Sequence, residues 1–183
     1  MKKKFFNAKL YRNEAANEMI IDNGKITQIG TNLPNCDEEI DLNGKLVLPP
    51  YVDPHLHLDY VYTLSELGQE GAGSGTLFEA IELWPQFKKT LTVESVKRLA
   101  MKGIKDEVSQ GVQHIRTHID VTDPKFTALK AMLEMKEELK DTVDIQIVAF
   151  PQEGMYMYKG GRDLVEEALK MGADVVGGIP HYE

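Results

Sequence analysis

The chain has 183 residues, of which 42% are hydrophobic and 27% are charged, a composition typical of a folded globular protein. Its formal net charge of −8 argues against nucleic acid or an anionic membrane as the main partner, because both attract clustered Lys and Arg. A single cysteine, Cys36, excludes an internal disulfide and a Cys-x-x-Cys metal site. The N-terminal lysines are not followed by the apolar stretch of a signal peptide or transmembrane helix, so we expect a cytoplasmic protein.

Residues 1–46 are the first expected domain, a small all-β unit that forms the N-terminal part of a β-sandwich. Asn23-Gly24 separates two apolar-rich runs of strand length, 18–22 and 25–30. Asn-Gly supplies the two positive-φ positions of a type I′ turn, so these runs are predicted to form a hairpin. Asn43-Gly44 repeats the pattern and predicts a second turn of the same kind.

Beyond Pro49-Pro50 the chain alternates between strand and helix patterns. The strands are expected at 46–57, 112–120, 144–150 and 174–179. The helices are expected at 76–89, interrupted or ended near Pro85, from Thr92 to Gly111, from Asp123-Pro124 onward, and at roughly 162–171. Such alternation implies parallel pairing with helical crossovers. The sequence therefore predicts an α/β fold in which 47–183 forms the first half of a (β/α)8 TIM-type barrel, truncated after about four parallel strands.

His55 and His57 lie two residues apart at the carboxyl end of the first of these strands. Alternate residues of a strand face the same side, so both imidazoles can reach one point. Two such histidines can equally be a partly buried polar pair, but sites in a TIM-type barrel are built at this end of the strands. Imidazole suits zinc or iron(II), and catalytic zinc commonly has three protein ligands, so the pair alone is an incomplete metal site.

Other polar residues accompany the later strands. The pattern favours a core or amino-end position for His114, whereas His118 and Asp120 lie nearer the carboxyl end, and a site role and a structural role remain open for both. Gln152 directly follows the strand at 144–150, and its carboxamide matches the donor and acceptor edge of a cyclic amide or pyrimidine. A solvated loop glutamine is an equal alternative. Trp84 is expected to serve helix packing.

Several stretches resemble the amidohydrolase superfamily and, within it, the bacterial cytosine deaminases. The His-x-His of 47–59 is shared across the superfamily, whereas Ser-Gly-Thr-Leu-Phe-Glu at 74–79 and Phe-Pro-Gln-Glu at 150–153 point to this family. The resemblance covers essentially the whole chain from about residue 45. It implies one divalent ion, Fe²⁺ or Zn²⁺, with His55 and His57 as metal ligands and with Gln152 and Leu77 as substrate-binding residues. The implied reaction is the hydrolytic deamination of cytosine to uracil and ammonia.

The sequence departs from these enzymes in one respect. They carry a further histidine ligand and the catalytic glutamate on strand five, another histidine on strand six and an aspartate ligand on strand eight, and none of these positions exists within the 183 residues. We therefore expect the chain alone to lack catalytic residues, to be inactive, to bind metal weakly and to be unstable. A homo-oligomer or a partner chain that supplies the missing strands would complete the barrel.

Two other functions stay open at this point. One is a related amidohydrolase that acts on an aminotriazine, isoguanine or another cyclic amide. The other is a non-catalytic βα domain that binds a full-length deaminase. The two enzymatic readings have a small-molecule substrate, and no reading requires nucleic acid or a membrane.

Overall fold

The computed structural model describes residues 1–66 and 76–183, which divide into two compact units, Met1–Pro49 and Pro50–Glu183. The glycine-rich stretch at 68–75 lies outside the described residues. Within the described ranges, no helix has both the length and the apolar character needed to span a membrane.

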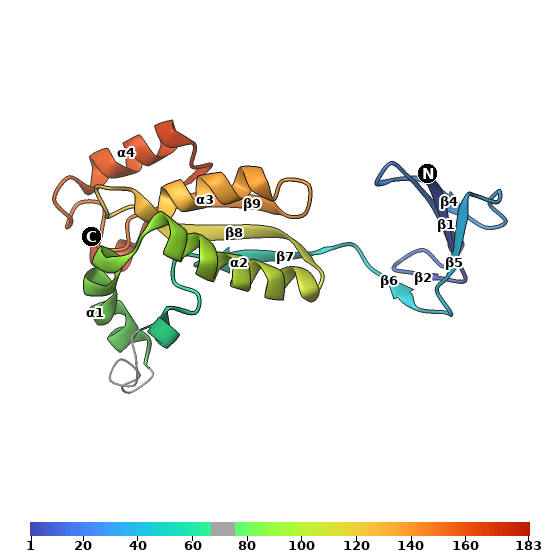
Figure 1. The fold of residues 1–183 in the computed structure, drawn as a ribbon, viewed down its shortest axis with the longest axis horizontal. Helices are drawn as coiled ribbons and strands as arrows, with labels where there is room; N and C mark the ends of the chain where they lie inside the picture. The colour runs from blue at the N-terminus through green and yellow to red at the C-terminus, as the bar shows by residue number, and fades with distance from the viewer. Residues whose placement is uncertain (67–75) are drawn as a thin grey trace. The chain divides into compact units, whose positions relative to one another are not determined.

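The first unit is built from short β-strands (Figure 1). Its four-stranded sheet has the order β4-β3-β1-β5, with β1 at Lys2–Phe6, β3 at Glu18–Asp22, β4 at Lys25–Gly30 and β5 at Glu38–Asp41. A separate parallel pair joins β2 (Lys9–Leu10) to β6 (Leu46–Val47).

The two Asn-Gly turns differ in whether the strands on either side of them pair with each other. Asn23 and Gly24 have φ values of 50° and 74° and connect the antiparallel strands β3 and β4, which confirms the predicted hairpin. Asn43 and Gly44 have nearly the same φ values, 52° and 73°, yet the strands on either side do not pair with each other. Instead β5 pairs with β1 and β6 pairs with β2. The predicted second turn is therefore present, but it does not form a hairpin, because the dipeptide fixes the local turn whereas strand partners are selected by long-range packing.

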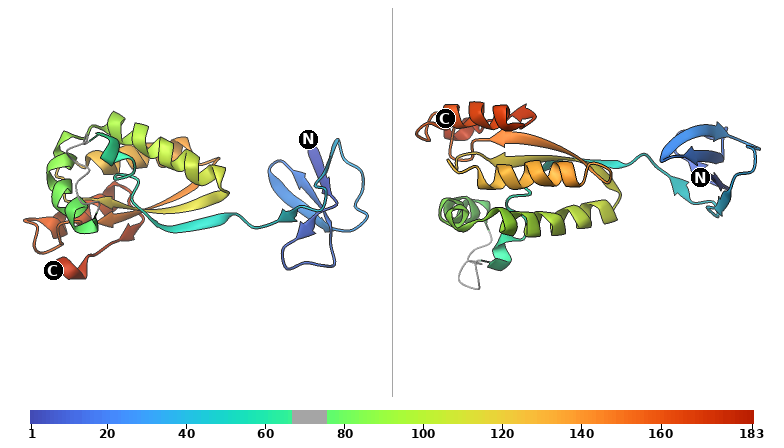
Figure 2. Two further views of the ribbon diagram at one scale, coloured as in Figure 1. Left: turned by 90° about the horizontal axis from the view of Figure 1, so that it is seen from below. Right: turned by 45° about the horizontal axis from the view of Figure 1, so that its top comes forward.

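The second unit contains a four-stranded parallel sheet of order β10-β9-β8-β7 (Figures 1 and 2). Its strands are β7 (Tyr51–Leu56), β8 (Val112–Asp120), β9 (Asp144–Phe150) and β10 (Val175–Val176). Its helices are α1 (Leu77–Phe87), α2 (Val93–Ser109), α3 (Thr127–Glu138) and α4 (Gly161–Met171), and 3₁₀ turns occur at Thr63–Glu66, Lys88–Thr90 and Pro180–Tyr182. The predicted parallel α/β sheet is confirmed.

Helices α2, α3 and α4 pack against one face of this sheet (Figure 1). The alternation of β8 shows why, since Ile115, Thr117 and Ile119 are almost completely buried under the helices. His114 and Arg116, at alternate positions of the same strand, are exposed on the other face. The apolar core therefore lies between the sheet and its helices.

The first strand of the barrel-type series is shorter than the predicted 46–57. Leu46 and Val47 belong to β6 in the first unit, and β7 begins only at Tyr51. Pro49-Pro50 separates them, because proline has no N–H to donate to a strand ladder.

The start of α3 also differs from the prediction. The Asp123 carboxylate accepts the backbone N–H groups of Lys125 and Thr127 in the turn before the helix. The N-cap position itself is occupied by Phe126, which is left-handed with φ of 53°. The helix therefore begins at Thr127, later than the predicted start at Asp123-Pro124.

Candidate functional site

A cluster of aromatic rings lies where β7, β8 and β9 end. The rings of His55 and His118 stack with centroids 4.1 Å apart, and His57 lies 5.5 Å from His118. Phe150, the last residue of β9, meets His57 and His118 edge-on at 5.5 and 5.6 Å. Parallel register produces this cluster, because Asp120 pairs with Phe150 and Leu56 with Thr117, which aligns the three strand ends. The structure thus adds His118 to the predicted pair.

The Nε2 atoms of His55 and His57 lie 3.4 Å apart. Two imidazole nitrogens bound to one tetrahedral zinc ion at about 2.0–2.1 Å would be separated by roughly 3.3–3.4 Å. The two rings therefore fit two corners of a metal site. Among the residues that the structure describes, no group of three or more His, Cys, Asp or Glu side chains is arranged to hold a metal ion.

The environment of these rings favours neutral imidazole. Burial, together with the neighbouring His118 and His55 rings, lowers the pKa of His57 to about 4. Burial and the nearby His55 also lower the pKa of His118. Neutral imidazole is the form that binds metal ions. At neutral pH His57 is therefore in the protonation state that a metal ligand needs.

A buried acidic layer lies behind the ring of His57. The Asp59 carboxyl is 2% exposed, and its Oδ2 accepts the backbone N–H of Asp120 at 2.8 Å. Its Oδ1 lies 3.9 Å from His57 Nδ1, and neither of these two atoms makes a hydrogen bond to any described residue. Burial raises the pKa of Asp59 well above its usual range, and the Asp120 carboxylate adds to this effect. Asp59 therefore keeps its proton to higher pH than an exposed aspartate.

Asp120 is the centre of a hydrogen-bond network. Its Oδ2 accepts Trp84 Nε1 at 2.6 Å and Lys88 Nζ at 3.0 Å, and its Oδ1 accepts the backbone N–H and the hydroxyl of Thr122 at 2.8 and 2.5 Å. The Trp84 ring also lies 3.8 Å from that of Tyr60. Trp84 is buried, which agrees with the expected packing role, and its indole N–H in addition bonds a carboxylate. No sequence signal identified Lys88, which reaches Asp120 through the tertiary fold.

Gln152 lies directly after β9, as its sequence position indicates, and its residue is 8% exposed. Its backbone N–H donates to Phe150 O at 3.1 Å in the turn that leaves the strand. The next residue, Glu153, is tied to Lys88 by an ion pair. Leu77 is the first residue of α1, but its side chain lies outside the part of the structure that is described.

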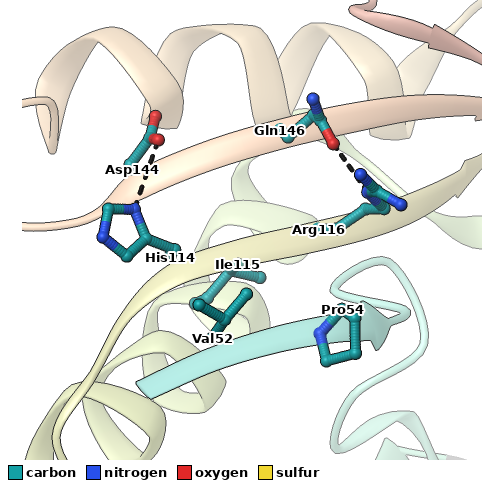
Figure 3. Close-up of a pocket in the computed structure, with 7 residues that line it drawn as sticks. All are labelled: Val52, Pro54, His114, Ile115, Arg116, Asp144 and Gln146. Carbon is teal, nitrogen blue, oxygen red and sulfur yellow. Dashed lines mark hydrogen bonds and ion pairs between the residues drawn. The ribbon is translucent and has the colours of Figure 1, made fainter. Parts of the chain in front are cut away.

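The opposite end of β8 carries a separate pocket of about 210 Å³ (Figure 3). Arg116 Nε donates to Gln146 Oε1 at 2.6 Å, and His114 Nδ1 lies 3.4 Å from Asp144 Oδ2. His114 is the third residue of β8, so its predicted amino-end position is confirmed and it does not join the histidine cluster. The remaining residues lining the pocket are Val52, Pro54 and Ile115.

Comparison with known proteins gives a consistent result. Residues 38–183 match the model of the amidohydrolase family. The structure of 5-methylcytosine deaminase from Klebsiella pneumoniae, liganded with 5-fluorocytosine, is 47% identical in sequence with a TM-score of 0.87, and the match covers 98% of this chain and 44% of that one.

Enzymes of triazine metabolism are also similar. N-isopropylammelide isopropyl amidohydrolase from Pseudomonas sp. (strain ADP) is 36% identical over 94% of this chain and 44% of its own length. The structure of N-isopropylammelide isopropylaminohydrolase from Burkholderia multivorans is 26% identical with a TM-score of 0.78, covering 96% of this chain and 44% of that one. The chain thus spans less than half the length of these relatives.

These matches identify the four-stranded parallel sheet as the amino-terminal part of the amidohydrolase barrel, as the sequence predicts. With a family match over 38–183 and a shared fold over nearly the whole chain, the protein belongs to the amidohydrolase family.

Proposed function

We propose that the whole protein is a divalent-metal hydrolase that deaminates cytosine or a 5-substituted cytosine. The observation that carries this proposal is the 47% identity to a 5-methylcytosine deaminase over 98% of the chain. In the reaction, the oxygen of water forms a bond to C4 of the base, the bond from C4 to the exocyclic nitrogen breaks, and that nitrogen leaves as ammonia.

The metal role rests on His55 and His57. Their Nε2 atoms are spaced to share one ion, and burial keeps His57 neutral, as a ligand must be. Zinc or iron(II) suits imidazole nitrogen. When bound, such an ion supplies Lewis acidity that activates water and polarises the base. Because no three potential ligands are arranged around one point among the described side chains, the proposal takes the remaining ligands from residues other than these two.

Base recognition is assigned to the segment after β9. The Gln152 carboxamide offers one acceptor and two donors, which match the adjacent C=O and N–H of a pyrimidine ring. Its residue is largely buried, so a hydrogen bond to the base would be formed away from bulk water. Leu77 is proposed to contact the base, on the family resemblance alone.

A second candidate is hydrolysis of an N-alkylated aminotriazine. The 36% identity to N-isopropylammelide isopropyl amidohydrolase favours it. Both reactions break a bond between a heteroaromatic carbon and an exocyclic nitrogen, so the same metal and water chemistry serves both. Sequence identity to the solved triazine enzyme is 26%, against 47% for the cytosine enzyme, and we therefore favour a cytosine substrate.

The proposal is tested by assaying the whole, metal-loaded protein with cytosine, 5-methylcytosine and N-isopropylammelide. We expect kcat/KM for at least one of the cytosines to exceed that for the triazine by roughly tenfold or more. Ammonia and isopropylamine are quantified separately, since they distinguish the two reactions. Isopropylamine as the main product would replace the cytosine proposal with the triazine one, and no amine release from any substrate would remove both.

A further inference from the structure

Lys88 lies just after α1, in the 3₁₀ turn Lys88–Thr90, and its side chain is only 9% exposed. The Nζ atom donates to Asp120 Oδ2 at 3.0 Å, to Thr122 O at 2.7 Å and to Thr122 Oγ1 at 2.9 Å. It also forms an ion pair with Glu153 Oε1. All of the ammonium's hydrogen-bonding capacity is therefore used inside the protein.

These contacts join segments that are distant in the sequence. Asp120 and Thr122 lie at the end of β8, and Glu153 lies in the turn after β9. Asp120 in turn donates its backbone N–H to Asp59, which follows β7. One ammonium group thus connects the three strand ends that carry His57, His118 and Gln152.

The two carboxylates that contact Lys88 differ in burial and in their other partners. The Asp120 side chain is 2% exposed and has several other donors, so the protein holds it firmly without Lys88. The Glu153 side chain is 31% exposed, and among the described residues it has polar contacts to Lys88 and, at 3.5 Å, to Thr122 Oγ1. Burial by itself lowers the pKa of Lys88, but the Asp120 and Glu153 carboxylates outweigh it and raise the pKa, so the ammonium stays charged.

Glu153 belongs to a tight turn that also contains Gln152. In this turn the Gln152 N–H donates to Phe150 O at 3.1 Å, and the Gly154 N–H donates to Pro151 O at 2.9 Å. Gly154 has φ of 88°, a conformation that side-chain-bearing residues rarely adopt. The backbone of the turn is therefore closed on itself, and the Lys88–Glu153 ion pair joins it to the 3₁₀ turn that follows α1.

We propose that Lys88 is a positioning residue for base binding: by holding Glu153 it fixes the turn at 151–154 and thereby sets where the Gln152 carboxamide lies. This inference rests on the proposed function for the role of Gln152. It assigns no contact between Lys88 and substrate. Its consequence is that loss of Lys88 weakens base binding more than it slows the chemical step.

The test compares Lys88→Met with Lys89→Met in the whole, metal-loaded protein. Methionine keeps most of the apolar stem of lysine and removes the charge, and Lys89 is an exposed neighbour whose ammonium bonds the Gln86 side chain. We expect Lys88→Met to raise KM for cytosine by about ten- to a hundredfold with a smaller change in kcat, because a misplaced binding group costs this much. Lys89→Met should match the parent protein, and Lys88→Arg, which keeps the charge, should recover part of the loss.

Hydrogen exchange separates this inference from the proposed function. The amides at 152–154 should exchange faster in Lys88→Met than in the parent protein and in Lys89→Met. If the parent protein does not deaminate cytosine, the proposed function fails, while exchange at 152–154 still decides whether Lys88 fastens the turn. Should Lys88→Met not fold, Glu153→Gln cuts the same ion pair at its more exposed end and should give the same two effects. Unchanged exchange and unchanged KM in the folded variants would overturn the inference.

Discussion

At the scale of single residues, His57 is where two features of the site meet. Its Nε2 faces His55, and its Nδ1 faces the buried Asp59 carboxyl 3.9 Å away. In metal sites the second nitrogen of a histidine ligand usually interacts with a carboxylate or carbonyl, which orients the ring. Asp59 is therefore placed to orient His57, although at this distance the pair is not a formed hydrogen bond.

We predict that His57→Ala lowers the affinity of the whole protein for zinc by more than roughly a hundredfold, because loss of a direct ligand should exceed the effect of losing an outer-shell partner. Competition with a chromophoric chelator measures the change. His114→Ala is the matched control, since this histidine lies at the other end of the sheet beside Asp144. Equal affinities of the two variants would contradict the metal role of His57.

The sequence identified only part of this site. His55 lies at the end of β7, and His57 and Gln152 come just after strands, so strand periodicity is enough to place all three at one edge of the sheet. Trp84 and Lys88 are different, because α1 brings them to Asp120 across 36 and 32 residues, and no spacing in the sequence records that contact. Asp59 follows the histidines in the sequence, but its burial depends on the packing of β8.

At the scale of elements, one side chain connects β7 to β8 beyond their backbone ladder. The backbone N–H of Leu58 donates to Thr117 Oγ1 at 3.0 Å, and both residues are fully buried. This bond holds the chain in place immediately after His57. The helix and strand patterns predicted β8 and β9 to the residue, because both are long and have regular apolar alternation, but they could not predict a side-chain bond between strands.

We predict that Thr117→Val lowers the free energy of unfolding by about 1–3 kcal/mol, because it removes the acceptor and leaves the buried Leu58 N–H unpaired. Thr117→Ser keeps the hydroxyl and serves as the control for the bond, although it loses one methyl group. Urea denaturation of both variants gives the comparison. If Thr117→Val were as stable as the parent protein, the bond would have no net stabilising effect.

The short strand β10 depends on a close backbone approach. Gly177 donates its N–H to Ala149 O at 2.8 Å, and a Cβ atom there would lie 2.8 Å from Ala149 O and 2.9 Å from Val148 Cγ1. The predicted strand at 174–179 is reduced to Val175–Val176, since the following glycines allow the chain to leave the ladder.

Gly177→Ala is therefore expected to destabilise the second unit by about 1–3 kcal/mol, because overpacking against the β9 backbone cannot be relieved by a side-chain rotation. Gly178→Ala is the matched control, since a Cβ at that position meets nothing within 4 Å. Thermal or urea unfolding monitored by circular dichroism should separate the two variants. Equal loss in both would show that glycine flexibility, and not the contact with β9, is responsible.

At the scale of the whole molecule, the parallel sheet of the second unit has β7 and β10 as its two edges. Apolar side chains are exposed on both of these strands, with Val52 at 61% and Val176 at 56%. Exposed sheet edges with apolar side chains favour association with other chains, and a charged residue at an edge suppresses it. The alternation of strand and helix patterns predicted the fold class. The same patterns do not predict which residues or chains cover the two sheet edges.

We predict that the 183-residue chain by itself self-associates in a concentration-dependent way and unfolds without a sharp transition. Sedimentation velocity over a range of concentrations and a thermal melt measure the two properties. Val176→Lys, which places a charge on the β10 edge, should shift the population toward monomer, while Lys170→Arg, on the exposed surface of α4, should leave it unchanged. If the parent chain stays monomeric at every concentration and melts in one cooperative step, the prediction is wrong and these edges are stable in water. Association driven by an exposed edge must increase as the protein concentration rises.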